Sequence, residues 1–305
     1  MSETAQAPEN AVRGRAEILT AVPTFFDDAG ELDHAATKAH FTDLAGRVDG
    51  LFVCGTTGEF PALDRAERRA VTEAALAVFG PDRVVVHVGA AATREAVALT
   101  REAVAVGATR LAALTPYYLP VDLGAVERHF AAVTGAAGPA VVYGYLFSER
   151  SGVVVGPAEF ARVAAATGLA GAKLSGAAAG RLAEYAAALP AGAPLWSGAD
   201  TTLAQVVRAG GAGIVSGLSA AFPEPFADLA DAVAADDAIL ERSAQARVDE
   251  VLDALGGTIE GIKLALRLQG RGNGALRMPA PEITPEAERR VARLAEEAAA
   301  ARAAR

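Results

Sequence analysis

The chain has 305 residues, of which 52% are hydrophobic, and a formal net charge of −9 at pH 7. The hydrophobic content excludes a disordered chain, and the acidic balance argues against nucleic acid and anionic membranes as partners. No apolar run reaches the roughly 18 residues of a membrane-spanning helix, and residues 1–12 lack the apolar centre of a signal peptide. We therefore expect a cytoplasmic protein whose residues 1–12 form a disordered tail.

Short apolar runs alternate with longer amphipathic stretches along most of the chain. The runs predicted as strands are Ile18–Val22, Gly50–Cys54, Val84–Val88, Arg110–Leu114, Ala140–Tyr143, Leu169–Lys173, Pro194–Ser197 and Gly213–Ser216. The helices predicted between them include Asp64–Phe79, Arg94–Val106, Leu123–Thr134, Pro157–Ala166 and Ala178–Leu189. Most of the strand-like runs are continuously apolar, as strands buried on both faces require. Eight repeats of strand then helix predict a (β/α)8 catalytic barrel over residues 13–225.

A doubly wound sheet is the alternative fold. It would more naturally carry a Gly-rich dinucleotide turn after its first strand, and Ala21–Phe25 offers none. After about Phe226 the strand patterns stop. The helices predicted there are Phe226–Ala235, Ala238–Leu255, Thr258–Leu268 and Pro285–Ala303. We expect residues 226–305 to form a C-terminal helical region packed on the barrel.

Lysine is rare in this chain. Only Lys38, Lys173 and Lys263 occur, and every other basic side chain except histidine is Arg. Lys173 ends the sixth predicted strand in a small, apolar context. A desolvated Lys forms Schiff bases with carbonyl compounds and an Arg does not, so this position suggests covalent amine chemistry. The alternative is a lysine that only extends its amine to water at a strand end; Lys263 and Lys38 are given structural and surface roles.

Two further features would lie at the same end of the barrel. Tyr143 ends the fifth predicted strand, about 5 Å from the sixth, where a phenol near the amine would relay protons; the alternative is an aromatic core residue. Gly55–Glu59 follows the second strand, and its glycines, hydroxyls and consecutive N–H groups fit a carboxylate. The alternative there is an ordinary turn in which Glu59 caps a backbone group.

No metal or cofactor is expected. The four histidines are scattered without the spacing of zinc ligands, and the single cysteine, Cys54, excludes both an internal disulfide and a cysteine-cluster metal site. The loop Leu114–Pro120, stiffened by prolines, carries two tyrosines that fit either a site or a subunit interface.

In combination, these segments resemble the dihydrodipicolinate synthase / N-acetylneuraminate lyase family, the class I pyruvate-dependent aldolases. The resemblance runs from about Ile18 to Pro285. It depends on an ordered set of motifs: Gly55–Glu59, Thr115–Tyr118, Tyr143, Gly171–Lys173, Ser197–Asp200 and Gly213–Ser216. The family forms barrels that are commonly tetramers and needs no metal, so the resemblance implies a homotetramer or homodimer without a cofactor.

The resemblance also implies roles for individual residues. Lys173 matches the Schiff-base lysine and Tyr143 the catalytic tyrosine of the fifth strand. Thr56 and Thr57 match residues that hold the pyruvate carboxylate and join the proton relay. Tyr118 matches the tyrosine that reaches across an interface into a neighbouring site, where it would help Tyr143 and Thr57 to move protons.

Further matches concern the substrate. Val215 matches a residue whose backbone carbonyl faces the substrate, and Arg150 corresponds to an arginine that binds a substrate carboxylate in the synthases. The segment between Tyr143 and Arg150 is about two residues longer than the family's, so a solvated loop Arg is the alternative. Ser175 and Asp200 fall where sugar-acid lyases contact substrate hydroxyls; the alternative is that both are turn residues.

The prediction is a Schiff-base lyase or aldolase acting on pyruvate or another small 2-oxo acid. It would join the 2-oxo acid to an aldehyde or imine, or cleave a 4-hydroxy-2-oxo acid. One alternative is a sugar-acid dehydratase or hydratase that uses the same iminium. Another is a non-catalytic barrel that binds a metabolite.

Overall fold

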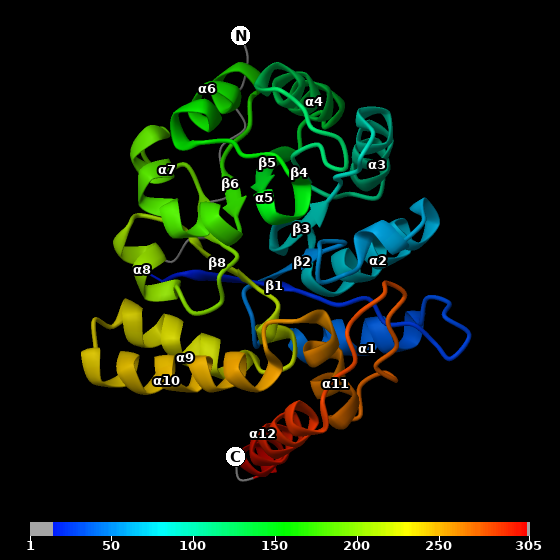
Figure 1. Cartoon of the computed structure of the whole chain (residues 1–305), viewed down its shortest axis with the longest axis vertical. Helices are drawn as coiled ribbons and strands as arrows, with labels where there is room; N and C mark the ends of the chain where they lie inside the picture. Colours follow the sequence, from blue (N-terminus) through cyan, green and yellow to red (C-terminus); the bar gives the residue numbers. More distant parts are fainter. Residues whose placement is uncertain (1–14, 304–305) are drawn as a thin grey trace.

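The computed structural model describes residues 15–303, so the tail predicted over residues 1–12 lies outside the described part. Eight parallel strands form a closed barrel in which each strand pairs with the next and β8 pairs with β1 (Figure 1). The strands are β1 (Glu17–Ala21), β2 (Gly50–Val53), β3 (Val84–His87), β4 (Arg110–Leu114), β5 (Val141–Leu146), β6 (Ala172–Leu174), β7 (Leu195–Ser197) and β8 (Gly213–Ser216). The predicted (β/α)8 fold is confirmed.

Helices surround the barrel and lie between consecutive strands. Those of more than one turn up to β8 are α1 (His34–Leu44), α2 (Arg65–Phe79), α3 (Thr93–Ala105), α4 (Leu123–Ala136), α6 (Pro157–Thr167), α7 (Leu182–Ala188) and α8 (Leu203–Arg208). Their ends follow capping rules. Asp64 and Glu67 form a capping box at the start of α2, and Gly168 ends α6 with a left-handed φ of 78°.

Two cores result from this arrangement. The larger core lies between the outer face of the barrel and the helices, and the smaller fills the barrel itself. The inner core includes Leu19, Phe52, Tyr143, Tyr145 and Trp196, all at most 3% exposed. Large aromatic side chains therefore fill much of the interior of the barrel, and charged side chains lie towards its ends.

Strand β5 runs three residues beyond its predicted end at Tyr143. It continues to Leu146, and Gly144 pairs in register with Ala172 of β6. Gly144 looks like a strand end in the sequence, but its role is packing: a Cβ there would lie 2.8 Å from the ring of Phe160 on α6. This difference moves the strand-end tyrosine by two positions.

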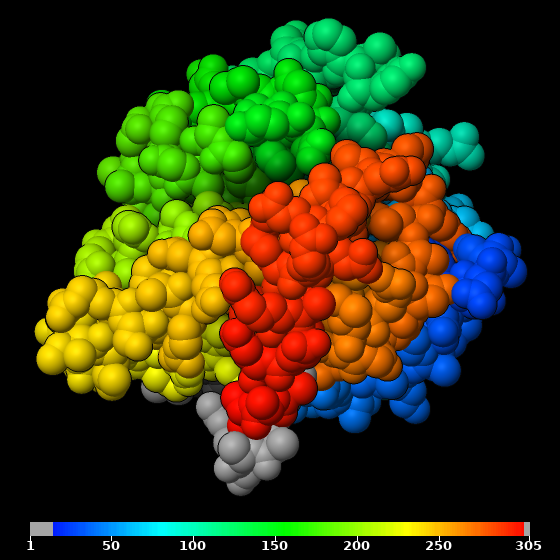
Figure 2. All heavy atoms as spheres, turned by 60° about the horizontal axis from the view of Figure 1, so that its bottom comes forward, coloured from blue at the N-terminus to red at the C-terminus, as the bar shows by residue number. Residues whose placement is uncertain are grey.

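The C-terminal part is helical, as predicted. It comprises α9 (Pro223–Ala234), α10 (Ala238–Leu255), α11 (Ile259–Leu268) and α12 (Pro285–Ala303), and the boundary expected at residue 225 falls inside α9. Helices α9 and α10 run side by side, and α12 crosses the surface between α10 and α11 (Figure 2). Within residues 15–303, no helix is both long and apolar enough to cross a membrane.

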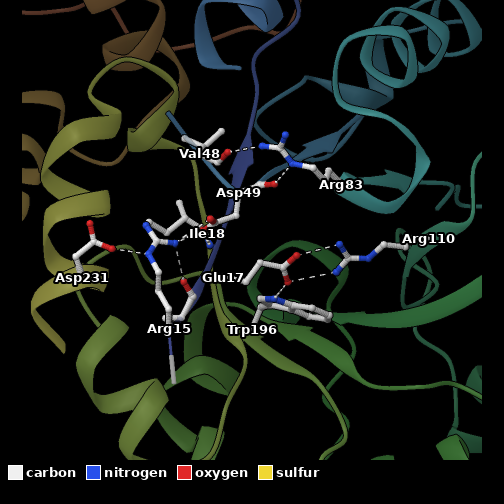
Figure 3. A network of polar contacts seen from close by, with 10 residues as sticks. Arg15, Glu17, Ile18, Val48, Asp49, Arg83, Arg110, Trp196 and Asp231 are labelled. Carbon is white, nitrogen blue, oxygen red and sulfur yellow. Dashed lines mark hydrogen bonds and ion pairs between the residues drawn. The ribbon is translucent and has the colours of Figure 1, made fainter. Parts of the chain in front are cut away.

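Charged side chains close the N-terminal end of the barrel. Arg110 donates to Glu17 over 2.9 Å, and the indole of Trp196 donates to the other oxygen of Glu17 over 2.8 Å. Arg15 pairs nearby with Asp49 at 2.8 Å (Figure 3). Every charge of this group faces a partner of opposite sign, which suits a stabilising rather than a reactive role.

Candidate functional site

Lys173 lies on β6 and points into the C-terminal half of the barrel interior. The residue is 6% exposed, and its Nζ lies 4.5 Å from the centre of the Phe52 ring and 4.3 Å from that of Tyr145. Among residues 15–303, no hydrogen bond or ion pair engages this amine. Gly198 at the end of β7 leaves room for it, since a Cβ there would lie 3.3 Å from Lys173 Cε. The amine is therefore buried and held among aromatic rings, and no carboxylate of the described residues lies within ion-pair distance of it.

The tyrosine beside Lys173 is Tyr145. It is the register partner of Lys173 on the neighbouring strand, is 1% exposed, and its hydroxyl lies 3.1 Å from Thr56 Oγ1. Phenol and hydroxyl together form a short proton path beside the amine.

The expectation that Tyr143 meets Lys173 is wrong in register. Tyr143 pairs with Ala112, one inward-facing position deeper in the barrel. Its ring packs edge-on against Trp196 at 4.9 Å and lies 5.9 Å from the Arg110 guanidinium, towards the N-terminal end. The cause is the continuation of β5 through Gly144. With Tyr145 as the strand-end tyrosine, the apparent two-residue lengthening before Arg150 disappears.

The Gly55–Glu59 turn follows β2 as predicted. Left-handed residues border it on both sides, because Cys54 has a φ of 55° and Glu59 a φ of 53°. Thr56 and Thr57 lie half-buried between them, and a Cβ at Gly217 after β8 would lie 3.3 Å from Thr57 Oγ1. The turn thus approaches both Tyr145 and the end of β8.

Two of the predicted substrate contacts, Ser175 and Asp200, lie at the same end of the barrel. Ser175 is buried directly after β6, and its Oγ would lie 2.1 Å from a Cβ at Gly198. Asp200 accepts hydrogen bonds from the Ser216 hydroxyl at 2.5 Å and from the Leu218 N–H at 3.3 Å. Burial raises the pKa of Asp200, while these hydrogen bonds and the charge of Lys173 oppose the rise.

Val215 lies on β8 and packs within the inner core, and it pairs with Leu19. It therefore belongs to the barrel wall that Lys173 faces from β6. The structure places its side chain in the core and leaves the predicted contact of its carbonyl a prediction.

Two predicted residues lie at the surface. Arg150 is on α5 (Ser148–Ser151), a single turn that the sequence pattern did not predict, and its guanidinium lies 5.8 Å from the Phe147 ring. Tyr118 is 87% exposed and has a φ of 82°, a left-handed conformation that a tyrosine rarely adopts. Neither residue contacts Lys173 or Tyr145 in the hydrogen bonds and ion pairs of residues 15–303.

Sequence reasoning missed the partner of Lys263. The sequence predicts a structural role for Lys263 outside the barrel, and the structure shows its form: a buried ion pair with Glu59, whose Oε1 lies 2.5 Å from Nζ, at the end of the Gly55–Glu59 turn. The available signal was the rarity of lysine, which applies to Lys263 as much as to Lys173.

The buried histidine near Lys173 is engaged by the backbone. His87 is buried, its Nδ1 lies 2.8 Å from the Cys54 carbonyl, and its Nε2 accepts from the Leu114 N–H at 3.3 Å. Burial lowers its pKa well below the ordinary value, which favours the neutral ring. Residues 15–303 contain no group of histidine, cysteine and carboxylate side chains able to hold a metal ion. The site brings together a buried amine, the neighbouring hydroxyls of Tyr145 and Thr56, and the Gly55–Glu59 turn with its backbone N–H groups.

Comparison with known proteins decides the family. The model of the dihydrodipicolinate synthetase family matches residues 15–298. The chain belongs to this family. It is accordingly an enzyme, a lyase or aldolase of the dihydrodipicolinate synthase type.

Individual relatives support the assignment. An uncharacterised DapA-like lyase of Halobacterium salinarum is 35% identical over 86% of this chain and 87% of its own length. A 4-hydroxy-tetrahydrodipicolinate synthase of Synechococcus is 31% identical over 86% of this chain and 88% of its own. A prophage protein of the family from Escherichia coli K12, whose crystal structure is a complex with pyruvate, is 26% identical to this chain. The two structures match with a TM-score of 0.83 over 92% of this chain and 98% of the prophage protein.

Proposed function

We propose that this enzyme forms a Schiff base between Lys173 and pyruvate or a closely related 2-oxo acid. The single observation that carries the proposal is the buried amine of Lys173, free of any ion pair among residues 15–303 and packed against Tyr145. Burying a lysine without an ion pair costs stability, so its presence here favours a role in a reaction. The relative whose crystal structure contains pyruvate supports the choice of substrate class.

The reaction begins when the free amine of Lys173 attacks the 2-oxo carbon. The carbinolamine then loses its oxygen as water, leaving an iminium. The iminium withdraws electrons from the neighbouring carbon, which gives up a proton to form an enamine. The enamine carbon attacks an aldehyde or imine carbon, or the reverse steps cleave a 4-hydroxy-2-oxo acid. Water finally hydrolyses the iminium and frees Lys173.

Tyr145 and Thr56 would move the protons in these steps. Their hydroxyls are 3.1 Å apart, so one can pass a proton to the other as the carbinolamine collapses. The backbone N–H groups of Thr56 and Thr57, with the Thr57 hydroxyl, would hold the substrate carboxylate. This arrangement orients the 2-oxo carbon towards the amine.

The second substrate would meet Ser175, Asp200 and Arg150. Ser175 and Asp200 lie after β6 and β7, on the side of Lys173 away from Tyr145, and supply a hydroxyl and a carboxyl group. Arg150 would contact an anionic end of the acceptor from the loop above. The carbonyl of Val215 would line the opposite wall.

We also propose that Tyr118 contacts a second copy of the chain, giving a homodimer or homotetramer. An exposed tyrosine held at a left-handed φ, next to a Leu119 that is 66% exposed, is a costly arrangement in water alone. Light scattering should find an assembly larger than a monomer, and Tyr118→Ala together with Leu119→Ser should weaken it. A monomer at micromolar concentration would contradict this part of the proposal.

Deuterium exchange tests the half-reaction without knowledge of the acceptor. In heavy water, enamine formation should replace the methyl protons of pyruvate by deuterium, which proton NMR follows directly. Lys173→Met should lower the exchange rate by at least about a thousandfold, since covalent catalysis is lost. Lys173→Arg keeps the charge and should be equally inactive. Exchange that continues in both variants would exclude the Schiff base.

A panel of aldehydes, imines and 4-hydroxy-2-oxo acids would then identify the acceptor. Consumption of pyruvate with one acceptor, or its release from one 2-oxo acid, would define the direction. Loss of water from a sugar acid without change in carbon number would instead identify a dehydratase.

A further inference from the structure

Lys263 and Glu59 form the most deeply buried ion pair in the described part of the chain. Their side chains are 2% and 0% exposed, and Nζ lies 2.5 Å from Glu59 Oε1. Lys263 comes from α11, outside the barrel, whereas Glu59 ends the turn that carries Thr56 and Thr57. The same amine also donates to the Ala275 carbonyl over 2.6 Å.

The second oxygen of Glu59 is bound by the segment after α11. It accepts from the backbone N–H groups of Arg277 at 2.9 Å and Met278 at 2.8 Å. Both oxygens of this carboxylate therefore receive donors from the C-terminal helical region. We call residues 273–278 the strap.

Arg277 joins the strap to the first turn of α2, the helix that follows the Gly55–Glu59 turn. Its guanidinium pairs with Glu67 of α2 at 2.6 Å and donates to the Gly30 carbonyl at 2.6 Å. The Phe26 ring has both cations over it, with Lys263 Nζ at 4.5 Å and the Arg277 guanidinium at 4.3 Å from its centre. The strap thus has anchors besides Glu59, so it can support the turn that Glu59 ends.

The turn that this support holds is strained. Cys54 and Glu59, on either side of it, both adopt left-handed backbone conformations that are unfavourable for residues other than glycine. Such residues persist where surrounding contacts over-determine them, and they cluster at functional sites. Here the contacts on Glu59 come from α11 and the strap.

We propose that Glu59 and Lys263 are positioning residues, through which the C-terminal helical region sets the geometry of Thr56 and Thr57 for the reaction at Lys173. The inference rests on the proposed function. A buried ion pair adds little net stability compared with well-packed apolar residues, so stability alone does not account for this one. Its position, joining α11 to the turn that touches Tyr145, accounts for it.

Variants at the pair separate positioning from stability. Lys263→Met leaves the Glu59 carboxylate buried without its cation and should lower both stability and the exchange rate of pyruvate. Glu59→Gln combined with Lys263→Met removes both charges, so most of the stability should return. The turn then lacks its ionic tether, and the exchange rate at saturating pyruvate should remain about tenfold below that of the natural chain, with a raised KM for pyruvate.

Arg110→Leu is the matched control. It breaks an ion pair of similar kind with Glu17 at the other end of the barrel, 2.9 Å between the charged atoms. It should lower the melting temperature while leaving the exchange rate and the KM of the folded fraction within about twofold. Activity that follows stability alike in all these variants, or recovers fully in the double variant, would overturn the positioning role. Absence of exchange in the natural chain would instead overturn the proposed function, and this inference with it.

Discussion

Both ends of the barrel contain a buried basic side chain beside aromatic rings, but only the one at the N-terminal end is paired with a carboxylate. At the N-terminal end, Arg110 faces Glu17, which also receives the Trp196 indole (Figure 3). At the C-terminal end, Lys173 lies against the rings of Phe52 and Tyr145, and no carboxylate pairs with it among residues 15–303. Matched charges stabilise a scaffold, whereas an unmatched buried amine is available for reaction. The contrast agrees with the general division of labour between the two faces of such barrels.

The two buried lysines repeat this contrast within the C-terminal end. Lys263 is paired with Glu59 and bound to a carbonyl oxygen, so its three donors are largely engaged. Burial lowers the pKa of Lys263, and the Glu59 carboxylate opposes that change. Lys173 has aromatic neighbours in place of such partners. This contrast is the basis of the proposal that one lysine organises the site and the other reacts in it.

The largest effect expected from the comparison concerns the two tyrosines of β5. Tyr145→Phe removes the hydroxyl beside Lys173 and should slow deuterium exchange of pyruvate about a hundredfold, the usual scale for a lost proton relay. Tyr143→Phe removes a hydroxyl nearer the N-terminal end and should change the rate less than about threefold. The reverse order of effects would show that Tyr143 is the relay after all.

The charged group at the N-terminal end should matter for stability. Arg110→Leu leaves Glu17 with the Trp196 indole as its one side-chain donor among residues 15–303. We expect the free energy of unfolding to fall by about 2 kcal/mol, a modest amount because Glu17 is partly exposed. Urea denaturation measures this change. Unchanged stability would mean that the ion pair between Arg110 and Glu17 does not stabilise the N-terminal end of the barrel.

A smaller effect is expected where the site needs space. A Cβ on Gly198 would lie 2.1 Å from Ser175 Oγ and 3.3 Å from Lys173 Cε, so Gly198→Ala should displace both side chains. Exchange should slow about tenfold through misplacement of the amine. Gly180, where a Cβ meets nothing within 4 Å, provides the control Gly180→Ala. Equal rates for the two variants would argue against tight positioning of Lys173.

The last prediction concerns the scaffold outside both ends, where stability should depend on pH. Burial, with the charges of Arg271 and Arg47, lowers the pKa of His40 from 6.5 to about 3. Between these values the unfolded chain binds the proton and the folded chain does not, so the stability is complete above pH 6.5 and falls on acidification. The slope should be about 1.4 kcal/mol per pH unit. Denaturation of His40→Gln between pH 6.5 and 4 should show a slope smaller by that amount; an unchanged slope would contradict the assignment.

The barrel could be predicted because its signal is repeated along the chain. Apolar runs, intervening helices and glycine punctuation recur eight times, so an error of two residues in one element leaves the topology intact. Lys173 could be singled out because lysine is rare and its strand is apolar. The end of β5 could not be predicted from the sequence. Gly144 is needed there because the ring of Phe160 on α6 packs against it, and this tertiary contact leaves no mark in the local pattern.

The strap and its ion pair depend on tertiary contacts across the chain. Glu59 and Lys263 are 204 positions apart, and nothing in the local pattern of either segment indicates the other. For Tyr118 and Arg150, the partners expected from the sequence lie outside the chain: a second subunit for Tyr118 and a substrate for Arg150. Local sequence patterns predict helices, strands and candidate nucleophiles. The relative positions of the side chains around a nucleophile depend on tertiary packing.

The central claim is that Lys173 is the nucleophile. Incubation with pyruvate followed by borohydride reduction, proteolysis and mass spectrometry tests it most directly. We predict one reduced pyruvyl group per chain, carried by the peptide that contains Lys173, with the Lys263 peptide unmodified. A folded protein whose Lys173 peptide remains unmodified, or whose adduct lies on Lys263, would contradict the account.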